Sequence, residues 1–258
     1  MSLKATGPLF KCFGSKWTSA RLLPKPTGEV IVEPFAGSAG YSLRHPHLDV
    51  VLYESSAHLR TLWKWIIEEA SETDVRDIPL GLAPGTDIRT LGLSEGQALL
   101  LKNWQRTNNV GDLWKTSVWG HLPGQWTANT RARVSEEIAL VKHWTMSDEE
   151  DGISAFDLHK GRRFTFMIDP PYQYNFKYLS AAMDYPLLAY LAQGVEGQVL
   201  ALEGACTKTG KVPDYLPFEY FTSQVTSRRK KFDNHHSSVL LYYKEQRRLQ
   251  VPKPRGVS

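Results

Sequence analysis

The chain has few cysteines and no long hydrophobic run. Its 258 residues include two cysteines, Cys12 and Cys206, which fits a reducing compartment. Apolar runs such as those at 98–101 and 239–243 fall far short of the about 18 to 20 residues that cross a bilayer. The N-terminal residues lack the apolar stretch of a secretory signal. We therefore expect a soluble protein in the cytoplasm, bacterial or, for a viral protein, that of its host.

Several ligand motifs are also missing. Neither the G-x-G-x-x-G turn of dinucleotide-binding folds nor the G-x-x-x-x-G-K-[ST] phosphate loop occurs. His235 and His236 adjoin Asp233, but no third ligand stands at metal-binding spacing. We therefore expect no metal site. No internal repeat or heptad pattern is present, and a monomer is the default expectation.

The net charge is modest, +4, but the basic residues are unevenly placed. The run Arg228, Arg229, Lys230 and Lys231 near the C-terminus is dense enough to bind a nucleic-acid backbone. A solvated face or a frayed tail is an equally good reading of that run.

Hydrophobic periodicity predicts a doubly wound α/β sheet that is interrupted once. Short β-branched runs at 29–33 and 49–54 predict parallel strands, and 57–70 has helical spacing. Residues 71–152 break this alternation and hold five of the eight tryptophans, with one expected helix at 130–144. Strands are expected again at 163–169, 198–203 and 237–244, and a helix at 179–193. We predict a catalytic domain from 1–70 and 153–247, an inserted domain at 71–152 and a flexible tail at 248–258.

The first expected strand runs into a glycine-containing turn, Pro34-Phe35-Ala36-Gly37-Ser38-Ala39-Gly40. Two glycines at the carboxyl edge of a doubly wound sheet let the main chain approach a ligand closely. Alone, this motif is equally consistent with a plain tight turn.

An acidic residue, Glu54, ends the second expected strand. A carboxylate at that place can accept hydrogen bonds from the two hydroxyls of a ribose. The alternative is a solvent-facing glutamate. Together with the glycine turn, and without a phosphate loop, Glu54 indicates a nucleoside-type cofactor.

The strongest motif is Asp169-Pro170-Pro171-Tyr172, at the end of an apolar strand. Two prolines force the chain out of the sheet, so the Asp169 carboxylate and the Pro170 carbonyl can converge as two acceptors. With Tyr172 as a stacking surface, they suit a planar exocyclic amine. The alternative is a buried strand end followed by a proline turn.

These motifs resemble those of DNA adenine-N6 methyltransferases of the Dam type. The turn at 35–40 matches that family's S-adenosyl-L-methionine motif, Asp169–Tyr172 matches its catalytic motif, and 10–16 resembles its N-terminal cofactor segment. That segment carries Cys12 where the family usually has tryptophan. The resemblance implies a Rossmann-like methyltransferase sheet with an inserted target-recognition lobe.

The resemblance also implies roles for individual residues. Lys16 would contact cofactor or target, Glu54 would hold the ribose, and Asp157 would meet the cofactor's adenine ring. The cofactor-binding set is then Lys16, Pro34, Phe35, Gly37, Ser38, Gly40, Glu54 and Asp157. Asp169, Pro170, Pro171 and Tyr172 would accept and clamp an adenine flipped out of the duplex.

DNA is the expected partner, and its recognition is expected in the insertion. Basic residues are interleaved there with tryptophans and asparagines, and the candidates for DNA contact are Arg106, Lys115, Arg131 and Arg133, joined by 228–231. A tryptophan-rich satellite core with solvated arginines is the alternative. For the whole protein, an RNA or cytosine-N4 methyltransferase, or a catalytically impaired nucleic-acid-binding homologue, remains open.

Overall fold

The sheet is mostly parallel and contains one reversed strand. The computed structural model describes residues 4–105, 114–117, 125–159, 163–173, 183–204, 213–224 and 237–245. Seven strands follow the order β3-β2-β1-β4-β5-β7-β6 in these residues. β7 is antiparallel to both β5 and β6, so β6 runs in the same direction as the other five. The strands are β1 Val30–Glu33, β2 Asp49–Leu52, β3 Thr145–Met146, β4 Thr165–Ile168, β5 Gln198–Gly204, β6 Glu219–Gln224 and β7 Ser237–Lys244.

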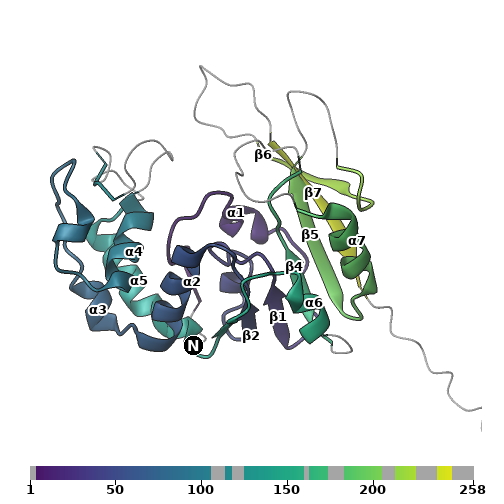
Figure 1. The fold of residues 1–258 in the computed structure, drawn as a ribbon, viewed down its shortest axis with the longest axis horizontal. Coiled ribbons are helices and arrows are strands. Elements are labelled where there is room, and N and C mark those ends of the chain that lie inside the picture. Colours follow the sequence, from purple (N-terminus) through teal and green to yellow (C-terminus); the bar gives the residue numbers. More distant parts are fainter. Residues whose placement is uncertain are drawn as a thin grey trace, which may run out of the picture.

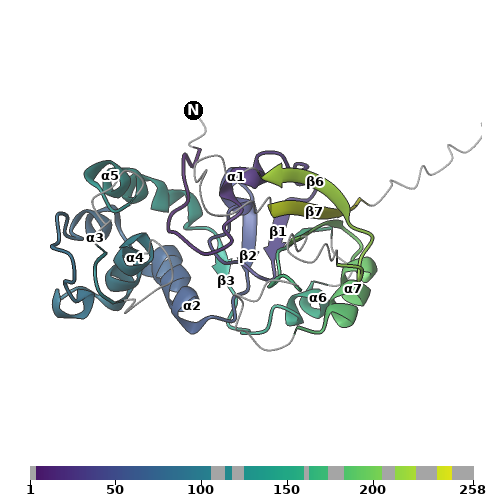
Figure 2. The same ribbon diagram turned by 90° about the horizontal axis from the view of Figure 1, so that it is seen from above.

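Helices flank this sheet, and a group of them extends beyond one end (Figure 1). The α-helices are α1 Trp17–Ala20, α2 Ala57–Lys64, α3 Glu72–Arg76, α4 Glu95–Gln105, α5 Ala128–Glu137, α6 Ser154–Leu158 and α7 Tyr185–Gly194. Tighter turns are η1 Ser42–Arg44, η3 Ile88–Thr90 and η4 Ile138–Val141, while η2 Trp65–Glu69 is a π-helical turn. Figures 1 and 2 both place α3, α4 and α5 beyond α2, and α6 and α7 near the opposite end.

Alternate residues of the strands pack into two separate hydrophobic cores. On one face, Phe166 and Ile168 of β4 pack in the cluster that includes α6 and α7. On the other face, Met167 belongs to the larger cluster that includes α2 and the helices beyond it. Because side chains alternate along a strand, this division follows from strands that are apolar at every position. The expected α/β class with a mainly parallel sheet is confirmed.

Several element boundaries differ from those expected. The helix expected at 57–70 is α-helical only to Lys64 and ends as the π-helical turn η2. The helix expected at 130–144 begins at Ala128 and becomes a 3-10 turn after Glu137. The helix expected at 179–193 starts at Tyr185 among the described residues, with proline in its first turn, a position where proline's missing N–H costs nothing.

Two strands were not expected. β3 is only two residues long and lies inside 71–152, the range assigned to the insertion, yet it pairs with β2 as the edge of the sheet. β6 pairs with β7 through a register shift. A two-residue strand has no periodicity to detect. The division into a catalytic domain and an insertion itself remains a prediction.

Among the helices in the described part of the chain, none is long and apolar enough to span a membrane.

Candidate active site

A cavity of about 350 Å³ lies at the carboxyl edge of the sheet, where the strand order reverses between β1 and β4. Open α/β sheets bind ligands at this switch point, because the loops that follow the two strands diverge there and leave a crevice. The lining residues come from the N-terminal segment and from the ends of β1, β2 and β4: Cys12–Lys16, Glu33, Phe35–Ser38, Gly40, Tyr41, Glu54–Ser56, His58, Leu59, Met167 and Asp169–Pro171.

The glycine turn after β1 is tightly built. Gly37 has a φ of +49° and Ala39 has a φ of +47°, a backbone region that residues other than glycine rarely adopt. A Cβ on Gly40 would lie 2.5 Å from the Trp17 main-chain nitrogen. The turn therefore packs its backbone against the N-terminal segment, and Ala39 carries the local strain that is common at ligand sites.

Glu54 ties the end of β2 to this turn. Its Oε2 accepts a hydrogen bond from the Gly37 N–H at 2.9 Å, and its Oε1 accepts one from the Ser56 N–H at 2.8 Å. Burial raises the pKa of Glu54, and these two N–H groups oppose the rise. A carboxylate has about four acceptor positions, so Glu54 retains lone pairs for a ligand.

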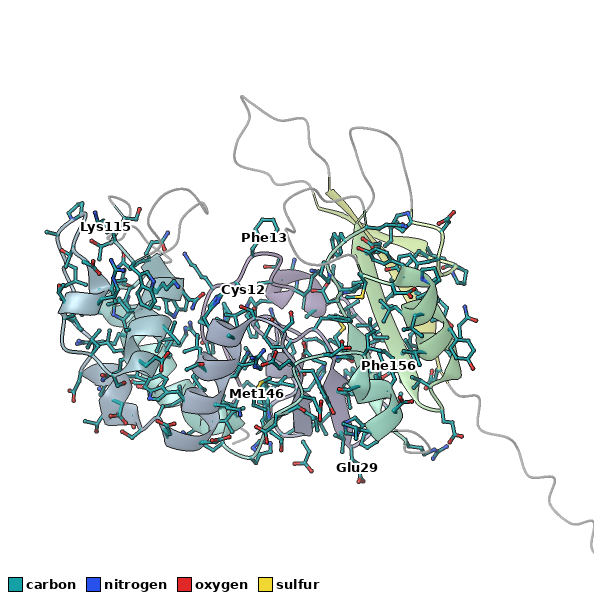
Figure 3. The ribbon with its side chains drawn as sticks, in the orientation of Figure 1. Cys12, Phe13, Glu29, Lys115, Met146 and Phe156 are labelled. Carbon is teal, nitrogen blue, oxygen red and sulfur yellow. The ribbon has the colours of Figure 1, made fainter. Side chains whose placement is uncertain are left out.

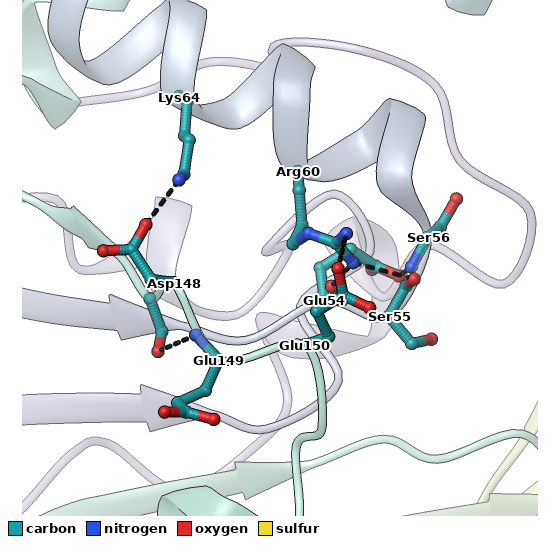
Figure 4. A network of polar contacts seen from close by, with 9 residues as sticks. Glu54, Ser55, Ser56, Arg60, Lys64, Asp148, Glu149 and Glu150 are labelled. Atoms are coloured by element: carbon teal, nitrogen blue, oxygen red, sulfur yellow. Dashed lines mark hydrogen bonds and ion pairs between the residues drawn. The ribbon is translucent and has the colours of Figure 1, made fainter.

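Next to Glu54, two basic residues of α2 form a network of ion pairs and hydrogen bonds (Figure 4). Arg60 donates to the Glu54 main-chain carbonyl and to the Glu150 carboxylate, and Lys64 donates to Asp148. The acidic run at 148–151 is thereby fastened to α2. These ion pairs leave Glu150 and Asp148 largely exposed, so each contributes little to stability.

Asp169 follows β4 and pairs with Lys16. The Lys16 Nζ donates to Asp169 Oδ2 at 2.6 Å and to the Gly14 carbonyl at 2.6 Å, and it lies 4.9 Å from the centre of the Tyr172 ring. Burial raises the pKa of Asp169, while Lys16 and the Tyr172 side chain lower it. Asp169 Oδ1 is buried and has no hydrogen-bond partner of good geometry among the described residues.

The residues after Asp169 are held from the neighbouring strand β5 and from α7. The Tyr185 hydroxyl donates to the Pro171 carbonyl at 2.7 Å. The Tyr172 ring lies against Gly204, where an added Cβ would be 2.5 Å from the ring. Pro170 and Pro171 line the cavity, whereas Tyr172 is not among its lining residues.

Glu33 is a cavity residue that sequence reasoning missed. It ends β1, is 3% exposed, and accepts hydrogen bonds from the Ser42 N–H at 3.0 Å and the Ser42 hydroxyl at 2.5 Å. Burial raises its pKa to about 7, and the negative charge of Asp169 adds to the rise. An ionisable residue directly before Pro34, at the end of an apolar strand, was the available signal.

The structure does not bring every predicted site residue to the cavity. Lys16, Phe35, Gly37, Ser38, Gly40 and Glu54 line it together with Asp169, Pro170 and Pro171. Asp157 is exposed on α6 and is not a lining residue, and neither is Pro34, whose carbonyl packs against Gly152.

Two of the arginines predicted to contact DNA are half-buried and hydrogen-bond within the protein. Arg131 donates to the Ile78 carbonyl, and Arg133 donates to the Pro8 carbonyl and pairs with Glu137. Lys115 is exposed, on the same side of the molecule as the cavity residue Phe13 and opposite Glu29, which precedes β1 (Figure 3). The remaining predicted contacts lie outside the described residues: Arg106, Arg228, Arg229, Lys230 and Lys231.

Within the described residues, no group of three or more His, Cys, Asp or Glu side chains is arranged to hold a metal ion. Comparison with models of protein families finds no match, and a search of curated proteins finds no similar sequence. The function must therefore be argued from the residues of the cavity.

Proposed function

We propose that the protein is an S-adenosyl-L-methionine-dependent DNA adenine-N6 methyltransferase of the Dam type. One observation carries the proposal. The three motifs that suggested this function, the turn at 35–40, Glu54 and Asp169–Pro171, are far apart in the sequence yet line one cavity. Neighbouring parallel strands bring their carboxyl ends to one edge, and these motifs meet there at the switch point between β1 and β4, where open α/β sheets bind ligands.

The charges of the cavity favour a cationic nucleoside over a phosphorylated one. Glu33, Glu54 and Asp169 line it, and Lys16, the one lysine or arginine among the described lining residues, is already paired with Asp169. Phosphates would meet carboxylates without a compensating set of donors. A sulfonium cofactor carries positive charge and no phosphate.

The residues present fit S-adenosyl-L-methionine. Glu54 has spare acceptor positions for ribose hydroxyls, and Gly37 in the turn lines the cavity with main chain alone. When bound, this cofactor supplies an electrophilic methyl group.

Asp169 would act on the adenine amine as a hydrogen-bond acceptor. Its buried Oδ1 has no well-placed donor, and an exocyclic N–H would satisfy it. Accepting this N–H draws the amine towards tetrahedral geometry, which localises the lone pair for attack. Positioning and electrostatics would supply most of the acceleration.

Lys16 and Tyr172 would complete the acceptor site. Lys16 neutralises Asp169 in the free protein, and its ammonium lies near the Tyr172 ring. An adenine bound to Asp169 must share that carboxylate with Lys16 or displace it. The Tyr172 ring, backed by Gly204, offers a face on which a flipped base can stack.

The test is a methylation assay. The protein is incubated with S-adenosyl-L-methionine and unmethylated DNA, the DNA is digested to nucleosides, and the nucleosides are identified by mass spectrometry. We expect N6-methyladenine from the wild type and a loss of at least about 100-fold in Asp169→Ala, because the amine loses its acceptor.

Asp49→Ala is the matched control, since Asp49 is exposed at the opposite end of the sheet, where β2 begins. Absence of product, or methylation of cytosine N4 alone, would contradict the proposal. Transfer to structured RNA in preference to duplex DNA would contradict the choice of substrate.

A further inference from the structure

A further carboxylate lies beside the candidate active site without lining its cavity. Glu203 is in β5, which pairs with β4, and is 0% exposed. A fully buried glutamate is costly unless its oxygens are satisfied. Its partners therefore indicate why it is there.

The partners of Glu203 belong to the loop that follows Asp169, to the end of β5 and to the segment before β6. Its Oε1 accepts from the Gly204 N–H at 2.9 Å. Its Oε2 accepts from the Tyr215 hydroxyl at 2.8 Å and from the Gln173 N–H at 3.4 Å. Gln173 directly follows Tyr172, so this carboxylate holds the main chain at the end of the catalytic motif.

Gly204 holds the same motif by shape. An added Cβ at this residue would lie 2.5 Å and 2.8 Å from two carbons of the Tyr172 ring. The ring therefore rests directly on the β5 main chain. Consecutive residues of β5 thus contact Tyr172 and its successor, one by packing and the other by a hydrogen bond.

The charged and titratable groups around Glu203 come from several segments. Tyr215 and Tyr185, whose rings contact each other, lie close to it, and so does Asp169 after the end of β4. Burial raises the pKa of Glu203 to about 7, Asp169 adds to the rise, and the three hydrogen bonds oppose it. Lys16 is paired with Asp169.

We propose that Glu203 is a positioning residue of the active site, fixing the Gln173 main chain so that the Tyr172 ring is held between Gly204 and the Lys16–Asp169 pair. For its effect on methyl transfer this inference rests on the proposed function. Its structural content, that Glu203 sets the orientation of Tyr172, does not.

The structural content is tested by ¹⁹F NMR of protein containing 3-fluorotyrosine, with the Tyr172 signal assigned from Tyr172→Phe. In Glu203→Gln the side-chain amide has one acceptor oxygen instead of two. It therefore cannot accept hydrogen bonds from both the Gly204 N–H and the Gln173 N–H, and one of them is lost. We expect the Tyr172 signal to shift or broaden. In the wild type it should move with pH near 7, and this movement should vanish in Glu203→Gln and persist in Glu33→Gln.

Tyr215→Phe is the second variant, because it removes one hydrogen bond to Glu203 and leaves the carboxylate in place. The matched control is Tyr243→Phe, because the Tyr243 hydroxyl donates to the exposed Glu245. If Glu203→Gln does not fold, the Tyr172 signal in Tyr215→Phe still tests the inference. A Tyr172 signal that is the same in wild type, Tyr215→Phe and Glu203→Gln would overturn the inference.

Kinetics then test the consequence for transfer. We expect kcat to fall about 10- to 100-fold in Glu203→Gln while KM for S-adenosyl-L-methionine stays unchanged, since a small misplacement of a stacked base costs rate rather than cofactor binding. Equal loss in KM and kcat would overturn the positioning role. If the wild type transfers no methyl group, the proposed function fails, and the NMR result still decides the role of Glu203.

Discussion

The residues of the site combine three buried or half-buried carboxylates with one lysine. Glu33 and Asp169 lie close enough for the charge of Asp169 to raise the pKa of Glu33, and Lys16 lowers the pKa of both. Such coupling of like charges in a buried site pushes titrations towards neutral pH. Lys16 is thus as important for the charge state of Asp169 as for its geometry.

This coupling predicts a pH dependence of methyl transfer. Asp169 accepts an N–H best when ionised, so the rate should fall as pH is lowered through its raised pKa. In Lys16→Met the opposing positive charge is gone, and the midpoint should move to higher pH. Single-turnover rates measured between pH 5 and 9 check this.

Lys64→Met is the control, because Lys64 is a half-exposed lysine of α2 that pairs with Asp148. It should leave the midpoint in place. A midpoint that Lys16→Met does not move would show that Lys16 is not what holds Asp169 in its ionised form.

At the scale of elements, the junction between α2 and the helices beyond it depends on close packing. α2 continues into the π-helical turn η2, and the Lys142 ammonium donates to the Ile66 carbonyl in that turn. Trp65 packs on Gly96 of α4, where an added Cβ would lie 2.0 Å from the indole ring. The helices can approach this closely only because residue 96 has no side chain.

Gly96→Ala should therefore destabilise the protein by about 1–3 kcal/mol through overpacking. Gly194→Ala, at the end of α7 with no atom within 4 Å of an added Cβ, should be neutral or stabilising by up to about 1 kcal/mol. Chemical denaturation followed by circular dichroism measures both. Equal stability of the two variants would refute the close contact at Trp65.

The elements also show what periodicity detects. Runs of four or more β-branched and apolar residues predicted β1, β2, β4, β5 and β7, because burial on both faces leaves an apolar stretch. β3 is too short for any such pattern. The end of α2 has the spacing of a helix, and sequence does not distinguish an α-helical from a π-helical turn.

For the whole molecule, the larger core does not stop at the edge of the sheet. One cluster contains Ile31 and Leu52 of the strands and also Trp104 and Trp126 of the segment predicted to be inserted. Trp104 and Trp126 have ring centroids 6.3 Å apart, and the Trp104 indole donates to the Leu9 carbonyl at 2.9 Å. These contacts join the tryptophans of this segment to the core of the sheet.

A shared core predicts shared unfolding. Transitions followed by tryptophan fluorescence and by far-ultraviolet circular dichroism should coincide. Trp104→Ala should lower the free energy of unfolding by about 3–5 kcal/mol and move both transitions together. Leu22→Ala, which truncates a side chain that is 54% exposed, is the control and should change little. Separate transitions would show that the helical segment unfolds independently of the sheet.

By itself the sequence determined the local features of this protein. The apolar runs determine which segments are strands, and Pro170–Pro171 determine that β4 ends just before Asp169, because proline has no N–H for the ladder and fixes φ. Cavity residues such as Gly37, Glu54 and Asp169 could be found for the same reason, since each stands directly at or after a strand end.

Only the tertiary structure decided which strand ends meet and which charges are buried. The order that places β1 beside β4 brings Glu33 to Asp169, and β5 beside β4 brings Glu203 to Gln173. It also gave Arg131 and Arg133 main-chain acceptors within the protein and left Asp157 exposed. Burial and the coupling of charges depend on neighbours far away in the chain, and no local pattern of residues specifies them.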